Sequence, residues 1–226
     1  MNRWQILLGG GLLAVGAVYV FASDAPLADV TISSDTVTVR RGAETVVTVC
    51  MNCHGLKYIK YRDLLDIGVD RDTLNLWKGD KDLNSALVSL TPPDVARDTY
   101  GVVPPDLSLI TAARRHGGRY VYSMLTGFYS DEQGFTANRV FPGIAMPDVL
   151  GYSFAGNDDE RHQIEHTARD VAGFLTWAAE PTASFRTTLG VGVIVYLVIL
   201  TSLLYLWKRR IWRRLDGSAA TAIRES

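Results

Sequence analysis

The sequence predicts a mainly α-helical protein with long loops and one membrane-spanning helix near its C-terminus. Apolar residues recur with helical spacing in several segments, and glycine and proline interrupt the chain between these segments. One apolar run near the end is long enough to cross a bilayer. The chain has 226 residues. When two long apolar segments are set aside, roughly 160 residues remain, which is enough for one domain with its own core.

The formal net charge of −1 hides an uneven distribution of charge. Residues 24–186 carry 22 acidic and 16 basic residues, whereas residues 208–226 carry six basic and two acidic ones. An acidic excess of this kind can steer a basic protein partner by long-range attraction, and we expect no nucleic-acid partner. Both cysteines lie in one motif, so no disulfide framework stabilises the fold.

Residues 1–25 have the features of a secretory signal. Arg3 provides a positive charge, residues 6–21 are apolar, and small residues follow at Ala22–Ala25. A retained N-terminal membrane anchor is the competing interpretation, because the apolar run is near the lower length limit for spanning a bilayer. Either interpretation places residues 26–186 outside the cytoplasm.

The segment before residue 50 and the segment after residue 54 carry weaker signals. Val30–Val49 is rich in threonine and valine, which predicts a short strand or an extended lead-in. Leu56–Leu65 carries apolar and aromatic residues at helical spacing, which predicts a helical face. Asp66–Tyr100 is polar and turn-rich, so we expect mostly loops with one short helix.

Residues 50–54, Cys50-Met51-Asn52-Cys53-His54, form the pattern C-x-x-C-H, which is typical of covalent attachment of a c-type haem. Two thiols three positions apart lie on one side of a helical turn, where each can form a thioether with a haem vinyl group. His54 then lies beneath the iron as an axial ligand. The motif therefore predicts one covalently bound haem c.

A chance pattern, a thioredoxin-like redox pair and half of a zinc site are the alternatives for this motif. A zinc site normally needs four cysteine or histidine ligands, and the chain has no third cysteine. A redox pair follows a strand in a βαβ pattern and does not require the histidine. These comparisons favour the haem.

Helix signals are stronger in the second half of the chain. Pro104-Pro105-Asp106-Leu107-Ser108 predicts the start of a helix that ends at Gly117-Gly118. A short helix is expected over Arg119–Phe128, and Ser130–Phe154 is expected to be irregular because of its glycines and prolines. A longer helix should begin near Asp158, where acidic residues suit the helix dipole, and stop at Pro181.

The last apolar segment, Thr187–Trp207, has no charged residue. At about 1.5 Å per residue it is about 32 Å long, enough for a hydrocarbon layer of about 30 Å. A buried core helix is the alternative, but basic residues follow at once, so we expect residues 187–207 to span the membrane. The basic tail, residues 208–226, should then lie in the cytoplasm.

The second axial ligand of the iron must come from a methionine or histidine. The candidates are Met51, Met124, Met146, His116, His162 and His166. Met51 lies inside the attachment motif and cannot reach the opposite face of a ring. Met124 fits the apolar side of a helix, and His162 and His166 fit a solvated helix face. Met146 lies among glycine and proline, in a loop that can be shaped around a ring, so we expect Met146 to be the ligand.

Several stretches, taken in order, resemble the cytochrome c1 family. They are Cys50–His54 with Tyr61-Arg62, Pro104–Ser108, Arg115–Gly118, Leu125–Gly127, Phe141–Gly143 with Ala145–Pro147, and Phe174–Pro181 before the final apolar segment. The resemblance runs from about Val49 to Trp207. It implies a cytochrome c-like haem domain in the respiratory ubiquinol–cytochrome c oxidoreductase, the cytochrome bc1 complex.

The resemblance also implies site residues and partners. Met146 would be the axial methionine, Arg115 would pair with a haem propionate, and Tyr120 would contribute to haem binding. Only Arg119 separates Gly118 from Tyr120, where the family commonly has two residues, and Met146 is followed by Pro147-Asp148-Val149 rather than by a proline run. The implied partners are cytochrome b, the Rieske iron–sulfur protein as electron donor, a cytochrome c acceptor and membrane lipid, in a dimeric complex.

The resemblance implies the bacterial inner membrane, with the haem domain on the periplasmic side. An iron with both axial positions filled has no site for substrate, so the isolated chain is not expected to be an enzyme. Two alternatives remain open. One is another membrane-anchored monohaem c-type cytochrome, acting as a carrier or an oxidase subunit, and the other is a haem enzyme or sensor with an open iron.

Overall fold

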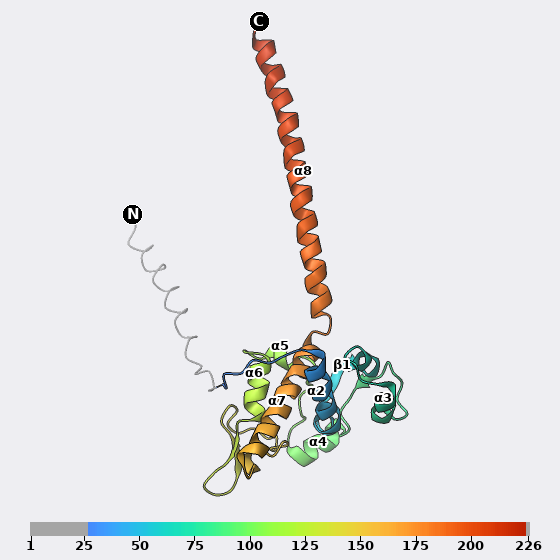
Figure 1. Cartoon of the computed structure of the whole chain (residues 1–226), viewed down its shortest axis with the longest axis vertical. Coiled ribbons are helices and arrows are strands. Elements are labelled where there is room, and N and C mark those ends of the chain that lie inside the picture. Colours follow the sequence, from blue (N-terminus) through green and yellow to red (C-terminus); the bar gives the residue numbers. More distant parts are fainter. Residues whose placement is uncertain (1–26, 225–226) are drawn as a thin grey trace, which may run out of the picture. The chain divides into compact units, whose positions relative to one another are not determined.

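The structure is a computed structural model that describes residues 27–224 (Figure 1). The segment 1–25, expected to be a signal or a membrane segment, lies outside the described residues. The chain divides into two compact units, one ending at Ala179 and one starting at Glu180. The described chain is mainly helical, which confirms the predicted fold class.

Six helices, three short 3-10 turns and two small two-stranded sheets make up the described part of the first unit. Their bounds are α2 Thr36–Thr48, η1 Cys50–Asn52, β1 Leu56–Lys60, η2 Tyr61–Leu65, α3 Arg71–Lys78, β2 Ala86–Leu87, α4 Pro93–Tyr100, α5 Ile110–Ala113, α6 Gly118–Leu125, β3 Phe128–Ser130, β4 Thr136–Asn138, η3 Tyr152–Phe154 and α7 Asp158–Ala179. The described part of the second unit is dominated by one helix, α8 Ala183–Arg224.

Helices α2 and α7 lie side by side at the centre of the first unit, with α6 also packed on α7 (Figure 1). Their backbones approach closely at Gly42, where a Cβ atom would lie 2.0 Å from the carbonyl oxygen of Asp170. Arg41 donates two hydrogen bonds to the buried Asp170 carboxylate, at 2.6 and 2.9 Å. This bidentate pair satisfies a charge that would otherwise be costly to bury.

The strand or extended lead-in expected for Val30–Val49 was wrong over most of its length, because residues 36–48 form helix α2. The carboxylate of Asp35 caps this helix by accepting hydrogen bonds from the backbone N–H groups of Val37 and Thr38, both at 3.0 Å. One helix face is buried against α7 through Val39, Ala43, Val46 and Val47. Burial of this face outweighs the strand preference of threonine and valine.

The helix expected over Leu56–Leu65 was also wrong. Residues 56–60 form strand β1, which pairs antiparallel with β2, and residues 61–65 form the 3-10 turn η2. Two backbone N–H groups of β1 donate hydrogen bonds to side chains, as they could not in a regular helix. The N–H of Lys57 donates to the Asp106 carboxylate at 2.8 Å, and the N–H of Tyr58 donates to the Ser108 hydroxyl at 3.1 Å. These distant acceptors stabilise an extended backbone here.

The remaining expectations for the first unit were partly correct. Residues 66–100 contain two short helices, α3 and α4, rather than one. The helix expected from Pro104 begins only at Ile110 and has four residues, because residues 104–108 are held by the attachment motif. The short helix near residues 119–128 and the long helix from Asp158 are confirmed as α6 and α7. Residues 130–154 are irregular apart from the last residue of β3, strand β4 and the turn η3, largely as expected.

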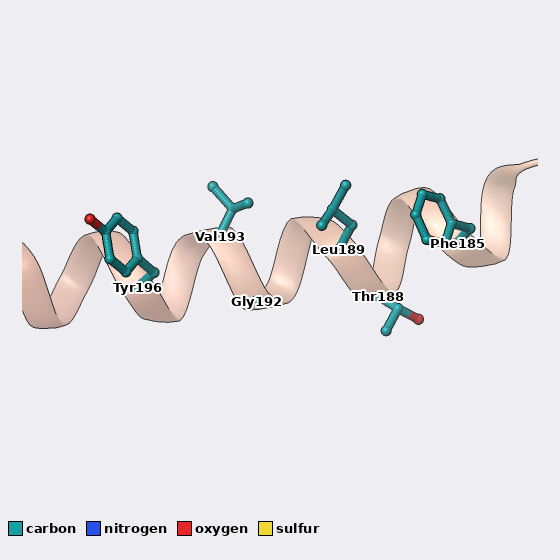
Figure 2. Close-up of a pocket in the computed structure, with 6 residues that line it drawn as sticks. All are labelled: Phe185, Thr188, Leu189, Gly192, Val193 and Tyr196. Carbon is teal, nitrogen blue, oxygen red and sulfur yellow. The ribbon is translucent and has the colours of Figure 1, made fainter.

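The second unit contains a helical stretch, Phe185–Arg213, that is long and apolar enough to cross a membrane. It includes the segment 187–207 predicted from the sequence. Figure 2 shows Leu189 and Val193 on one side of α8 and Thr188 on the other. These side chains are exposed, which suits contact with lipid or with another membrane helix.

Candidate haem-attachment site

Residues 50–54 form a tight turn directly after α2. The backbone N–H groups of Cys53 and His54 both donate to the carbonyl oxygen of Cys50, at 3.1 and 2.9 Å. The side-chain amide of Asn52 donates to the carbonyl oxygens of Thr48 and Val49, at 3.2 and 3.0 Å, and so covers the C-terminal end of α2. The position of the motif is therefore fixed by the helix that precedes it.

Both cysteines are free thiols and partly exposed. Burial raises the pKa of the Cys50 thiol to about 11, so this sulfur is protonated at neutral pH. Over residues 27–224, no group of three or more histidine, cysteine or acidic side chains is arranged to hold a metal ion. The two cysteines lie on one hydrogen-bonded turn, an arrangement that suits thioether formation with a single haem.

The imidazole of His54 is oriented by the backbone of Pro105. Its Nδ1 lies 2.7 Å from the Pro105 carbonyl oxygen. A carbonyl oxygen only accepts hydrogen bonds, so Nδ1 carries the proton and the lone pair of Nε2 is left available. Burial also lowers the pKa of His54, which favours the neutral ring. His54 is thus prepared to bind a metal through Nε2.

Residues 105–108 are tied to the attachment motif by further hydrogen bonds. The N–H of Leu107 donates to the carbonyl oxygen of Gly55 at 2.8 Å. The Asp106 carboxylate accepts two hydrogen bonds from backbone N–H groups. Its Oδ2 accepts from Lys57 at 2.8 Å, and its Oδ1 accepts from Ser108 at 3.0 Å. The sequence indicated Pro104–Ser108 only as a helix start, and the orienting roles of Asp106 and Ser108 were missed. The sequence offered one signal for these roles, namely that residues with hydrogen-bonding side chains flank Leu107 on both sides.

Met146 lies in an irregular segment that we call the methionine loop, residues 139–153. Its side chain is partly buried and packs against the hydrophobic core of the first unit. The expectation of a loop around Met146 is confirmed, whereas its role as an iron ligand stays a prediction.

The other candidate ligands lie where the sequence suggested. Met51 is a core residue with 2% exposure, and Met124 packs against the core from α6. His162 and His166 lie on an exposed face of α7, where their Nδ1 atoms are 3.3 Å from Glu165 and 3.2 Å from Asp170. His116 follows α5 in an exposed turn and has a left-handed backbone, with φ of 68°.

Arg115 and Tyr120 lie on either side of the tight turn between α5 and α6. Arg115 is exposed, and Tyr120 is partly buried in the first turn of α6. The guanidinium of Arg114 lies 5.5 Å from the centre of the Tyr120 ring, within the range of a cation–π contact. The predicted site residues thus fall on three segments: the attachment turn, the α5–α6 turn and the methionine loop.

Large apolar side chains are exposed on the segments that carry Pro105 and Met146. They include Tyr100, Val102, Val103, Leu109, Phe141 and Val149. An apolar ligand covers such side chains in many binding sites. Two thiols, a neutral imidazole with Nε2 available, a thioether in a shaped loop and this apolar surface together fit a haem.

Comparison with known proteins gives a consistent result. The model of the cytochrome C1 family matches residues 26–86 and 80–215. The cytochrome c1 of Rhodospirillum rubrum is 30% identical over 219 residues, covering 77% of this chain and 80% of that protein. A mitochondrial cytochrome c1 of Solanum tuberosum, named a heme protein, is 31% identical and covers 73% of this chain and 74% of its own length. A Nitrosomonas europaea protein named ammonia monooxygenase gamma subunit is 29% identical, covering 80% and 84%.

Proposed function

Because this chain belongs to the cytochrome c1 family, we propose that it is the haem-bearing electron-transfer subunit of a cytochrome bc1 complex. The observation that carries the proposal is the attachment turn, in which the two cysteines share one turn and the His54 imidazole is oriented by Pro105. This arrangement matches what covalent attachment and axial ligation of one haem c require.

Each site residue has a distinct role in this proposal. Cys50 and Cys53 form the two thioethers, and His54 and Met146 bind the iron through Nε2 and sulfur. The bound haem supplies a one-electron couple. A thioether ligand favours the reduced iron more than a second imidazole does, which suits a late step in an electron chain. With both axial positions filled, the chain transfers electrons and binds no substrate at the iron.

Arg115 pairs with a haem propionate in this proposal, and Tyr120 contributes to the same end of the ring. Arg115 can serve in this way because a guanidinium forms directional hydrogen bonds to carboxylates. The exposed position of Arg115 in the turn between α5 and α6 is consistent with this assignment.

Membership of the family supports our proposal for the direction of electron flow and the placement of the chain. Electrons pass from the Rieske iron–sulfur protein through the haem to a cytochrome c acceptor. Residues 26–186 form the periplasmic haem domain, residues 187–207 cross the bacterial inner membrane, and residues 208–226 form the cytoplasmic tail. Helix α8 supports this arrangement because its apolar stretch ends in basic residues. Cytochrome b and lipid surround that helix in a dimeric complex.

Purification from the membrane tests the proposal. In mild detergent the chain should travel with a di-haem cytochrome b and a Rieske protein, and the complex should reduce cytochrome c with a quinol. A monodisperse single subunit would contradict the proposal and favour a free membrane-anchored cytochrome. A second candidate function, a subunit of an ammonia monooxygenase, is suggested by the name of the Nitrosomonas relative. Co-purification with ammonia monooxygenase subunits would favour it.

Substitution of methionine tests the coordination separately. Met146→Leu should open the iron, so that ferrous haem binds carbon monoxide readily and the reduction potential falls. Met124→Leu is the matched control, because Met124 packs against the core from α6. Equal loss of the native spectrum in both variants would contradict the assignment of Met146.

A further inference from the structure

We propose that Asp148 is a positioning residue that holds the methionine loop in the shape that presents Met146 to the iron. The inference rests on the proposed function, in which Met146 is the axial ligand. It concerns the stretch Met146-Pro147-Asp148, where the carboxylate lies two residues beyond the ligand. Two residues of extended chain span at most about 7 Å, so a bond made by Asp148 restrains Met146 directly.

The side chain of Asp148 closes a turn with Ser153. Its Oδ2 accepts hydrogen bonds from the backbone N–H of Ser153 at 2.7 Å and from the Ser153 hydroxyl at 2.8 Å. The N–H of Gly151 donates to the Asp148 carbonyl oxygen at 3.3 Å, and Gly151 has a φ of 75°, which glycine adopts without strain. The turn ends where η3 begins, so it connects the ligand segment to a defined element.

The opposite end of the methionine loop is fixed by another buried side chain. Oδ1 of Asn138, in β4, accepts hydrogen bonds from the N–H groups of Val140 and Phe141, at 2.9 and 3.0 Å. Its amide donates to the carbonyl oxygen of Met124 at 2.7 Å, which ties the loop to α6. One polar side chain therefore holds each end of the loop.

The segment between these two anchors has few bonds of its own. In the described chain, the last backbone hydrogen bond before Met146 is that of the Ile144 N–H to the Phe141 carbonyl oxygen, at 3.2 Å, and the N–H groups of Ala145 and Met146 make none. Asp148 is consequently the nearest hydrogen-bonded anchor on the C-terminal side of Met146. Without it, Met146 would be restrained only by packing and by the Asn138 anchor at the other end of the loop.

The two oxygens of Asp148 differ in a way that makes the proposal testable. Oδ2 accepts both bonds from Ser153, whereas Oδ1 is buried and accepts none from the described residues. Asparagine can keep an oxygen at the Oδ2 position and place a neutral amide at the Oδ1 position. Asp148→Asn should therefore preserve the clamp and remove only the charge, while Asp148→Ala removes both.

The experiment compares variants of the full chain in the intact membrane complex. The readouts are the fraction of ferrous haem that binds carbon monoxide, the absorption band of methionine-ligated ferric haem, and the reduction potential. Asp148→Ala removes the acceptor of both bonds from Ser153, so it should raise the carbon monoxide-binding fraction at least about tenfold. Ser153→Ala, which keeps the backbone bond, should raise it less.

Asp148→Asn should restore methionine ligation and raise the potential, because it removes a negative charge that favours the ferric iron. An Asp148→Ala protein that matches the parent, or an Asp148→Asn protein as defective as Asp148→Ala, would overturn the proposal. If Asp148→Ala does not accumulate, a Ser153→Ala protein identical to the parent would overturn it.

Met146→Leu separates this inference from the proposed function. If Met146→Leu leaves the iron closed, Met146 is not the ligand and the coordination in the proposed function is wrong. If Met146→Leu opens the iron and Asp148→Ala does not, only the clamp is wrong.

Discussion

The two sides of the candidate haem site are held by different kinds of contact. The attachment region, residues 50–58 with residues 105–108, is joined by hydrogen bonds between residues 49 to 52 positions apart in the chain. The methionine loop is held at its two ends mainly by side-chain bonds that reach two to five positions, and one further bond, from Asn138 to Met124, spans 14 positions. The attachment region therefore depends on the complete fold, whereas local turns shape the methionine loop. Damage to the fold should remove the haem, and damage to the loop should change only its coordination.

The largest effect is expected from Gly42→Ala, which tests whether the attachment region depends on α2 and α7. The new Cβ would lie 2.0 Å from the Asp170 carbonyl oxygen and 2.8 Å from the Phe174 Cβ, so the helices must separate. We expect a loss of about 3 kcal/mol in the free energy of unfolding and a lower haem content. Urea unfolding and haem staining measure both. Glu44→Ala, on the exposed face of α2, is the control, and equal haem content in the two variants would break the comparison.

Asp106→Ala is expected to have the next largest effect, because it removes the acceptor of two backbone N–H groups in the attachment region. We expect a loss of about 2 kcal/mol in the free energy of unfolding and reduced covalent haem. Asp148→Ala should keep its covalent haem. The comparison fails if Asp106→Ala retains full haem and merely opens the iron. Asp106→Asn, which keeps one acceptor, should lie between Asp106→Ala and the parent.

Asp35→Ala tests the start of α2 and should have a pH-dependent effect. Hydrogen bonds from the Thr38 and Ser33 hydroxyls, and then from backbone N–H groups, hold the pKa of Asp35 well below its usual range. A lowered folded-state pKa stabilises the fold above the unfolded pKa of about 3.9, and that stability is lost as the pH falls through the folded value. The parent should therefore melt at a higher temperature than Asp35→Ala at pH 7, and the difference should shrink below pH 4. A constant difference would exclude a role for the charge.

Tyr100→Phe should produce the smallest effect and would sharpen the comparison within the attachment region. The Tyr100 hydroxyl lies 3.6 Å from the Cys53 sulfur. Once Cys53 is bound to haem, its thioether sulfur can only accept hydrogen bonds. The Tyr100 hydroxyl would then donate a weak hydrogen bond to this sulfur and withdraw electron density from the haem. Loss of this hydrogen bond should lower the reduction potential by less than about 30 mV. For a one-electron couple, about 59 mV is a tenfold change in the equilibrium constant, so about 30 mV is a threefold change. A redox titration measures this, and a rise in potential would show that Tyr100 does not donate to the sulfur.

The sequence predicted the parts of the site that depend on short spacing. The C-x-x-C-H turn, the irregular stretch around Met146 and the apolar segment before the basic tail were all identified from neighbouring residues. Helix α2 was missed because threonine and valine favour strands, and only its burial against α7 makes it helical. The bond from His54 to Pro105 joins residues 51 positions apart, and a single sequence contains no signal for it.

The partner of His54 has a genetic consequence. Pro105 contributes its main-chain carbonyl oxygen, an atom that every amino acid carries. A point substitution at position 105 can move this oxygen but cannot delete it, whereas a carboxylate in the same role would be lost in a single step. The orientation of the histidine is thus buffered against mutation at the residue that provides it. Substitutions at Asp106 and Ser108 are more damaging, because the side chains of these residues hold residues 105–108 against strand β1.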